Sequence, residues 1–149
     1  MRSAPAGTVG LALTLAALAL AGAPPAGAGG VGAVVRVAVT GGAFTASSGL
    51  VHTFARPECA ADDGRPTPLT ALFDAARRYR LGGVWVRWDA ATQDYVVLRI
   101  RGDAADSTRV WNAYVNEKKI TTTPCRTAIK DRDKVRWTLE APSGAAKKS

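Results

Sequence analysis

The chain is short of the residues on which most catalytic and metal sites depend. Its 149 residues include one histidine, two cysteines and one methionine. His52 is the only histidine and has no second histidine at ligand spacing, which disfavours a zinc site or a Ser-His-Asp triad. The sequence therefore argues against zinc chemistry and against triad hydrolysis.

Other catalytic signatures are missing as well. Ser47-Ser48-Gly49 lacks the strand-to-helix context of a nucleophile elbow. No glycine-rich loop leads from a strand into a helix, as a phosphate loop would. Asp62 and Asp63 are adjacent acids without the further spaced oxygens of a cation site. We expect no enzyme activity, no catalytic residue, no metal ligand and no resident cofactor.

The two cysteines have neither a C-x-x-C spacing nor a neighbouring histidine, which disfavours a redox or nucleophilic role. Cys59 and Cys125 are 66 residues apart. In an exported chain they can form one intramolecular disulfide. The chain-entropy model gives roughly 4 kcal/mol for closing such a loop, which is a large part of the net stability of a small domain.

No apolar run reaches the roughly 20 residues that a membrane-spanning helix needs. The run from Val9 to Leu20 follows Met1-Arg2 and precedes a small-residue region ending in Ala26-Gly27-Ala28. This order predicts a secretory signal peptide over residues 1–28, a short linker over 29–33, and a protein that is extracellular or in the cell envelope. A retained membrane anchor is the alternative.

Acidic residues are outnumbered: 20 lysines and arginines against 12 acids give a formal net charge of +8. Such a charge favours acidic partners, such as wall polymers, anionic lipids, acidic proteins or extracellular nucleic acid. Of these we expect an anionic envelope component rather than nucleic acid. The alternative is that the charge only keeps an exported protein in solution.

The patterns that are present predict an α+β domain. The runs Val34–Val39 and Leu50–Phe54 form an opening hairpin. After a loop rich in proline and acids, Thr67 caps a helix that has Pro68 in its first turn and ends at Leu81-Gly82-Gly83. The apolar residues at helical spacing form one buried stripe: Leu69, Leu72, Phe73, Ala76 and Tyr79.

A second hairpin runs from Val84–Trp88 to Tyr95–Arg101. Strict alternation places an apolar set against the core and a mixed aromatic and basic set on the other face. That set is Trp85, Arg87, Tyr95, Arg99 and Arg101. Polar-out alternation is ordinary for a one-sided sheet, but aromatic and arginine side chains together can also stack on and pair with an anionic, ring-bearing ligand.

Two further strands are expected. In Val110–Asn116, Trp111 faces the core, while Asn112, Tyr114 and Asn116 lie on the opposite face. A last strand runs from Val135 to Leu139, and we expect residues 141–149 to be a disordered basic tail.

The segment from Val110 to Leu139 resembles the transcobalamin-like C-terminal domain family of small bacterial exported proteins. In that family a Trp precedes a Tyr-Val-Asn-Gly hairpin, and a Gly-Asp turn leads into a strand that carries another Trp. The matching residues are Trp111, Tyr114, Val115, Asn116, Asp133, Val135 and Trp137. Glu117 and Arg132 replace the two glycines. Since Glu resists the positive φ of a tight Asn-Gly turn, we expect that turn to be wider or of another type.

The resemblance implies a β-grasp-like fold over residues 34–140, with a mixed or antiparallel sheet packed on one helix. In vertebrate cobalamin carriers the similar domain is the smaller half of a two-domain clamp on the vitamin. Cobalamin is therefore the ligand that the resemblance suggests, and this chain would supply one wall of such a clamp.

We expect a secreted, non-enzymatic module for a small ringed ligand. The candidate ligand-binding residues are Trp85, Arg87, Tyr95, Arg99, Arg101, Asn112 and Tyr114. The alternative is an interaction domain for envelope proteins or wall polymers. A third reading is a small protease inhibitor with "ECAADDGRPTP" as its reactive loop.

Overall fold

A computed structural model describes residues 31–142 of the chain. The predicted signal peptide at 1–28, the start of the linker and most of the predicted tail lie outside the described residues. Among the described residues, no helix is long and apolar enough to cross a membrane.

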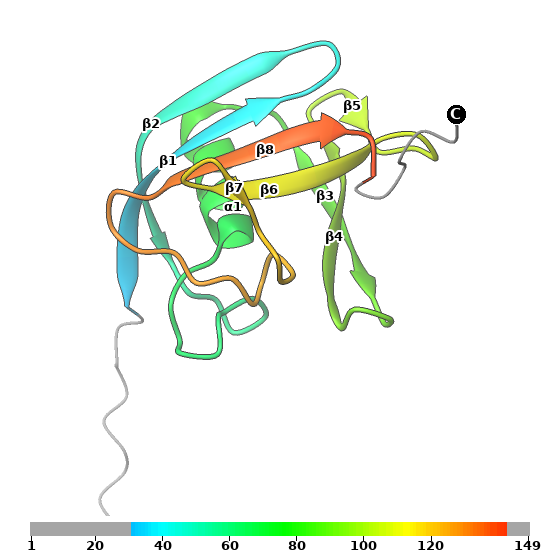
Figure 1. Cartoon of the computed structure of the whole chain (residues 1–149). Helices are drawn as coiled ribbons and strands as arrows, with labels where there is room; N and C mark the ends of the chain where they lie inside the picture. The colour runs from blue at the N-terminus through cyan, green and yellow to red at the C-terminus, as the bar shows by residue number, and fades with distance from the viewer. Residues whose placement is uncertain (1–30, 143–149) are drawn as a thin grey trace, which may run out of the picture.

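The described chain folds into two sheets and one helix (Figure 1). The larger sheet has the order β2-β1-β8-β6-β7, in which β1 and β8 are parallel and the other neighbours antiparallel. Its strands are β1 (Gly32–Thr40), β2 (Thr45–Phe54), β6 (Val110–Val115), β7 (Lys118–Lys119) and β8 (Lys134–Glu140). The smaller sheet consists of β3 (Val84–Asp89), β4 (Asp94–Ile100) and β5 (Asp103–Ala104).

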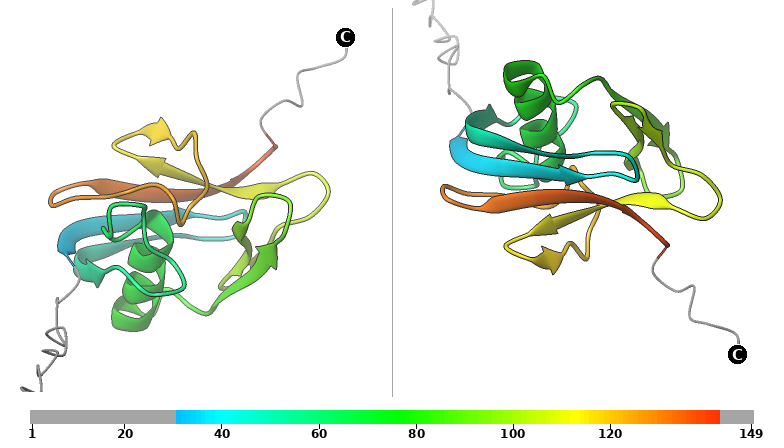
Figure 2. Two further views of the ribbon diagram at one scale, coloured as in Figure 1. Left: turned by 90° about the horizontal axis from the view of Figure 1, so that it is seen from below. Right: turned by 90° about the horizontal axis from the view of Figure 1, so that it is seen from above.

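Helix α1 (Pro68–Tyr79) and the smaller sheet lie on the same side of the larger sheet (Figure 2). The α+β class, the single helix and the disulfide predicted from the sequence are confirmed. The second hairpin belongs to a sheet of its own, because its strands pair only with each other and with β5. Its Val97 and Ile100 are buried in the core that it shares with the helix. The described residues place no helix on the opposite face of the larger sheet, which faces the viewer in Figure 1.

The helix begins at the predicted residue. The side chain of Thr67 accepts a hydrogen bond from the Thr70 backbone N–H, and the Thr70 hydroxyl accepts one from the Thr67 N–H, so two free donors are satisfied reciprocally. Pro68 stands at the start, where its missing N–H is not needed. Arg80 ends the helix in a left-handed conformation with φ 51°.

Alternation along the central strands builds the core. Val35, Val37 and Val39 of β1 are buried against the helix side of the sheet, as are Val135 and Trp137 of β8. The Trp137 indole N–H donates to the carbonyl of Pro68, which joins sheet to helix. Trp111 is buried as predicted, and its indole donates to the carbonyl of Asp103 in β5.

Strand β2 is longer than the predicted Leu50–Phe54, because it continues through a bulge. At the bulge the Ser48 hydroxyl accepts a hydrogen bond from the Val37 N–H at 2.8 Å. A side chain thus replaces a carbonyl of the ladder, and the strand runs on despite its Ser and Gly residues.

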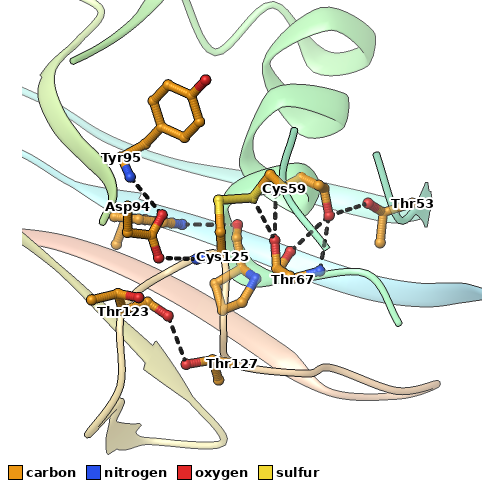
Figure 3. Close-up of a disulfide and its surroundings, with 11 residues drawn as sticks. Thr53, Cys59, Thr67, Asp94, Tyr95, Thr123, Cys125 and Thr127 are labelled. Carbon is orange, nitrogen blue, oxygen red and sulfur yellow. Dashed lines mark hydrogen bonds between the residues drawn. A yellow bond between two sulfur atoms is a disulfide. The ribbon is translucent and has the colours of Figure 1, made fainter. Parts of the chain in front are cut away.

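The predicted disulfide joins Cys59 to Cys125 (Figure 3). Asp94, at the start of β4, is almost wholly buried beside it and accepts hydrogen bonds from the backbone N–H groups of Cys125 and Tyr95. The Cys59 sulfur lies 3.2 Å from the hydroxyl of the helix cap Thr67. The bridge therefore ties two long loops to the helix start and to the second hairpin.

The hairpin between β6 and β7 corrects one expectation. Asn116 and Glu117 form a two-residue loop with φ 50° and 66°, which is the signature of a type I′ turn, so the predicted wider turn is wrong. The Asn116 side chain donates to Asp133 and accepts from the Lys134 N–H, which holds the turn against the next one. Arg132, the other replaced glycine, also adopts a positive φ of 70°.

Candidate functional site

The structure distributes the seven predicted ligand residues over four places, of which the one holding Arg101, beyond the end of β4, is described below. Trp85, Arg87 and Arg99 lie on the outer face of the second hairpin, turned away from the helix. Tyr95 lies on the opposite face of that hairpin. Asn112 and Tyr114 lie on the open face of the larger sheet.

A bulge in β4 explains why Tyr95 and Arg99 do not share a face. Trp85 pairs with Arg99 and Val86 pairs with Val97, so Leu98 is an extra residue between the two pairs. An extra residue reverses the alternation beyond it. Strict alternation is therefore wrong for this strand, and the predicted common face of Tyr95 with Arg99 is corrected.

The outer face of the hairpin carries an aromatic shelf, defined by Trp85, Arg87, Leu98, Arg99, Ala104 and Ala105. Trp85 is 50% exposed, and the Arg99 guanidinium carbon lies 5.2 Å from the centre of its ring. The shelf has a hollow of about 340 Å³. Another hollow, of about 420 Å³, lies elsewhere on the molecule. The Ala105 N–H donates to the Leu98 carbonyl, which sets the β5 segment beside the bulge.

The shelf is basic. Neither Arg99 nor Arg87 forms an ion pair with any described residue. The pKa of Asp89 lies below its ordinary value, chiefly because Asp89 accepts a hydrogen bond from Thr92, and the charge of Arg87 adds to this effect. Arg101 lies beyond the strand at φ 56°, and its guanidinium stacks on Phe44 at 5.3 Å. The shelf can therefore offer an aromatic ring and two guanidinium groups that form no ion pair to one ligand.

Tyr95 belongs to a separate groove. Its ring packs edge-on against Trp88, with centroids 5.2 Å apart. The groove of about 210 Å³ lies between the hairpin and the helix, and it is lined by Arg56, Glu58, Cys59, Leu69, Phe73, Val86 and Tyr95. Arg56 stacks on Phe73 and pairs with Asp74 at 2.7 Å, so the groove has a fixed wall on the helix side.

Asn112 and Tyr114 are engaged with neighbouring strands. Both donate to the same carboxylate oxygen of Glu140, and Arg136 stacks over the Tyr114 ring at 4.1 Å. The hydrogen bond to Glu140 raises the pKa of Tyr114, and desolvation adds to it. The two residues join β6 to β8, and they lie apart from the aromatic shelf.

Sequence reasoning missed Leu98, Ala104 and Ala105 of the shelf, and the groove residues Arg56, Glu58 and Phe73. The bulge has no marker in the sequence, because Val-Val-Leu-Arg-Ile reads as a regular strand. The sequence around Ala104 has no strand pattern, and the structure places Ala104 in the short strand β5.

The described residues contain no candidate metal site, since no group of three His, Cys, Asp or Glu side chains lies close enough together to hold an ion. Asp106, for example, stabilises its own loop, because its carboxylate accepts hydrogen bonds from Thr108 and Arg109.

No family model matches the chain, and no curated protein matches it. Solved structures match the chain by their fold. Haptocorrin in complex with Cbi aligns with 74% of this chain at 12% identity and a TM-score of 0.55, and the chain spans about a quarter, 26%, of haptocorrin. A protein from Ruminococcus gnavus ATCC 29149, provisionally described as metal-binding, aligns over 74% of this chain and 98% of its own at 14% identity, with a TM-score of 0.45.

The haptocorrin match confirms the predicted likeness at the level of the fold. The similar part of haptocorrin is its C-terminal region. At 12% identity the likeness says nothing about individual ligand-binding residues.

Proposed function

We propose that this chain is a non-enzymatic binding module, and that the aromatic shelf holds a ligand with a planar ring and a negative charge. The observation that carries the proposal is the half-exposed Trp85 ring with Arg99 stacked against it and Arg87 on the same face. A flat ring can stack on Trp85, while the two guanidinium groups pair with the charge.

The size of the shelf suits a small molecule. Its hollow of about 340 Å³ falls within the roughly 300–1,000 Å³ of ordinary ligand sites. The ligand is covered from one side only, whereas tight sites bury most of a ligand's surface. We therefore expect dissociation constants on the order of micromolar or weaker for the isolated chain.

The first experiment uses corrinoids, because haptocorrin, whose fold this chain shares in part, was solved with Cbi. Purified chain is dialysed to equilibrium against cobinamide or cobalamin, and the visible absorbance of the corrin is compared on the two sides of the membrane. Excess corrin on the protein side supports a carrier-like role. Equal absorbance on both sides removes corrinoids as ligands and leaves the shelf to anions with a planar ring.

A second probe tests ligand binding at the shelf independently of corrinoids. Flavin mononucleotide combines a planar ring with a phosphate, and its fluorescence reports binding. We expect Trp85→Ala to weaken binding by about tenfold, the loss of roughly one stacking and charge contact.

Trp88→Ala is the matched control, because Trp88 is 52% exposed on the same strand but packs against Tyr95 on the other face. Equal losses in both variants, or no binding of either probe, would remove the shelf as the site.

The fold gives little support to the hypothesis of a protease inhibitor. In the proposed reactive loop Cys59, Ala61 and Pro66 are buried, and the exposed residues are Glu58 and Asp62–Gly64. The interaction reading, in contrast, gains from a second basic region on the open face of the larger sheet.

A further inference from the structure

The open face of the larger sheet has a hollow of about 420 Å³ at the start of β1 and β8. We name it the β1–β8 hollow and define it by Val34, Arg36, Leu50, Asp131, Arg132 and Lys134. It is a different face of the molecule from the aromatic shelf, and no residue is shared between the two.

Three exposed cations surround this hollow without a partner. Arg36 and Lys134 are directly paired neighbours in the parallel β1–β8 ladder, and Arg132 stands in the turn just before β8. None of the three forms an ion pair with any described residue. Like charges side by side on one sheet face destabilise it, so this arrangement lacks a purely structural benefit.

The acids of the hollow form no ion pair with these cations. One oxygen of Asp131 accepts from the Val34 N–H at 2.7 Å. Asp133 is buried, and its oxygens accept from the Asn116 side chain and the Lys130 N–H. Both carboxylates therefore shape the turn and hold it against β1.

Arg132 occupies its place at a conformational cost. Its φ of 70° lies in the left-handed region, where glycine is unstrained and a side chain is not. The transcobalamin-like pattern has glycine at this point of the turn, and this chain has an arginine. The Arg132 N–H donates to the Val34 carbonyl at 2.9 Å, so the strained residue is fixed at the rim of the hollow. Strain of this kind is typical of functional positions.

We propose that the β1–β8 hollow binds the phosphate group of a phosphate ester, with Arg36, Arg132 and Lys134 as its ligands. Two guanidinium forks and one ammonium suit the several oxygens of a phosphate. Val34 and Leu50, the latter 51% exposed, form an apolar wall beside the cations. The wall receives the carbon part of the ester, whether that is a soluble molecule or the headgroup region of a lipid.

The test uses the purified chain with two probes. Glycerol 3-phosphate, titrated by calorimetry, represents a soluble ester. Phosphatidylglycerol vesicles, with phosphatidylcholine vesicles as the uncharged-surface control, represent the lipid in a sedimentation assay. Binding of glycerol 3-phosphate identifies a free ester as a sufficient ligand. Binding of phosphatidylglycerol vesicles alone identifies a headgroup that needs the apolar wall as well.

Arg132→Gly is the decisive variant. We expect it to weaken binding by about tenfold, the loss of one charge-assisted contact, and at the same time to raise the denaturant midpoint because the backbone strain is relieved. A merely structural role for Arg132 predicts no loss of binding. If the variant does not fold, Arg36→Gln carries the same expectation for binding.

Arg126→Gln is the matched control, because Arg126 is an exposed arginine near the disulfide, away from the hollow. It removes one charge and should change affinity by no more than about twofold at moderate salt, where distant charges are screened. Loss in Arg126→Gln equal to that in Arg132→Gly would show that only net charge matters, and it would overturn the proposal. Failure of both probes to bind the unaltered chain would overturn it as well.

Discussion

Single residues in left-handed conformations show how this chain tolerates local strain. Glu117 and Arg132 take positive φ values where a glycine would be relaxed. Each is fixed by its surroundings: Glu117 by the ladder between β6 and β7, and Arg132 by its hydrogen bond to Val34. Tertiary structure thus imposes turns that the residues themselves disfavour.

Replacing Glu117 with glycine should stabilise the fold. The substitution relieves the positive φ and removes only a surface ion pair to Arg136, so we expect a net gain of about 0.5–1 kcal/mol. Urea denaturation would show a higher midpoint with an unchanged slope.

The reverse change is the control for this prediction. Gly64 has φ 75° and open space around its Cα, so Gly64→Ala tests backbone strain alone. It should destabilise the fold by about 1 kcal/mol. Equal stability of all three proteins would mean that these turns relax without cost.

Tyr114 gives a pH-dependent prediction at the same scale. Its pKa is raised above the ordinary 10.0, chiefly because it donates a hydrogen bond to Glu140. A folded-state pKa that is raised contributes stability that is fully present below pH 10 and is lost as the pH rises through the raised pKa.

Ultraviolet titration of the phenolate would measure this shift. Glu140→Gln should bring the pKa of Tyr114 back towards its ordinary value, because the acceptor then carries no charge. An unchanged titration in the variant would assign the shift to burial instead.

At the scale of elements, the loops are held by one covalent bridge and one buried acid. The disulfide and Asp94 together fix the loops on either side of the helix start, and the Ile129 N–H donates to the Pro66 carbonyl between those loops. The helix cap Thr67 lies directly beside Cys59. The order of these loops therefore depends on the bridge.

Removal of the bridge should cost a large part of the stability. For Cys59→Ala combined with Cys125→Ala we expect a loss of about 2–5 kcal/mol, because the unfolded chain regains the entropy of a 66-residue loop. Thermal unfolding followed by circular dichroism measures the loss. Reduction of the unaltered chain should reproduce it, and an unchanged midpoint in either case would contradict the prediction.

At the scale of the whole molecule, the two faces of the larger sheet have different surroundings. One face is covered by α1 and the smaller sheet (Figure 2), which build the core with it. The other face is open and carries charged side chains such as Arg36 and Lys134. The fold of this chain is similar to a part of haptocorrin that makes up 26% of that longer protein. The disulfide indicates an oxidising compartment, in agreement with export.

Export itself is testable on the intact protein. We expect the signal peptide to be cleaved after Ala28, so that mass spectrometry of protein from the native host finds Gly29 at the N-terminus. The protein should appear outside the cytoplasm with the Cys59–Cys125 bridge formed. A membrane fraction that retains Met1 would establish the anchor instead.

Much of the fold was predictable, because it depends on local patterns that physical chemistry makes reliable. Valine alternation in β1, the Thr67-Pro68 helix start and the paired cysteines each specify one element or one bridge. Trp111 and Trp137 could be assigned to the core because they alternate with polar residues.

The sequence by itself therefore determined the class of the fold, its helix, its bridge and the core side of the central strands β1 and β6. Only the tertiary structure decided which polar residues share a face. The bulge at Leu98 separates Tyr95 from Arg99, and the meeting of β1 with β8, which are distant in the chain, brings Arg36 beside Lys134. Register and strand order arise from the packing of the whole sheet, and alternation along one strand contains no information about either.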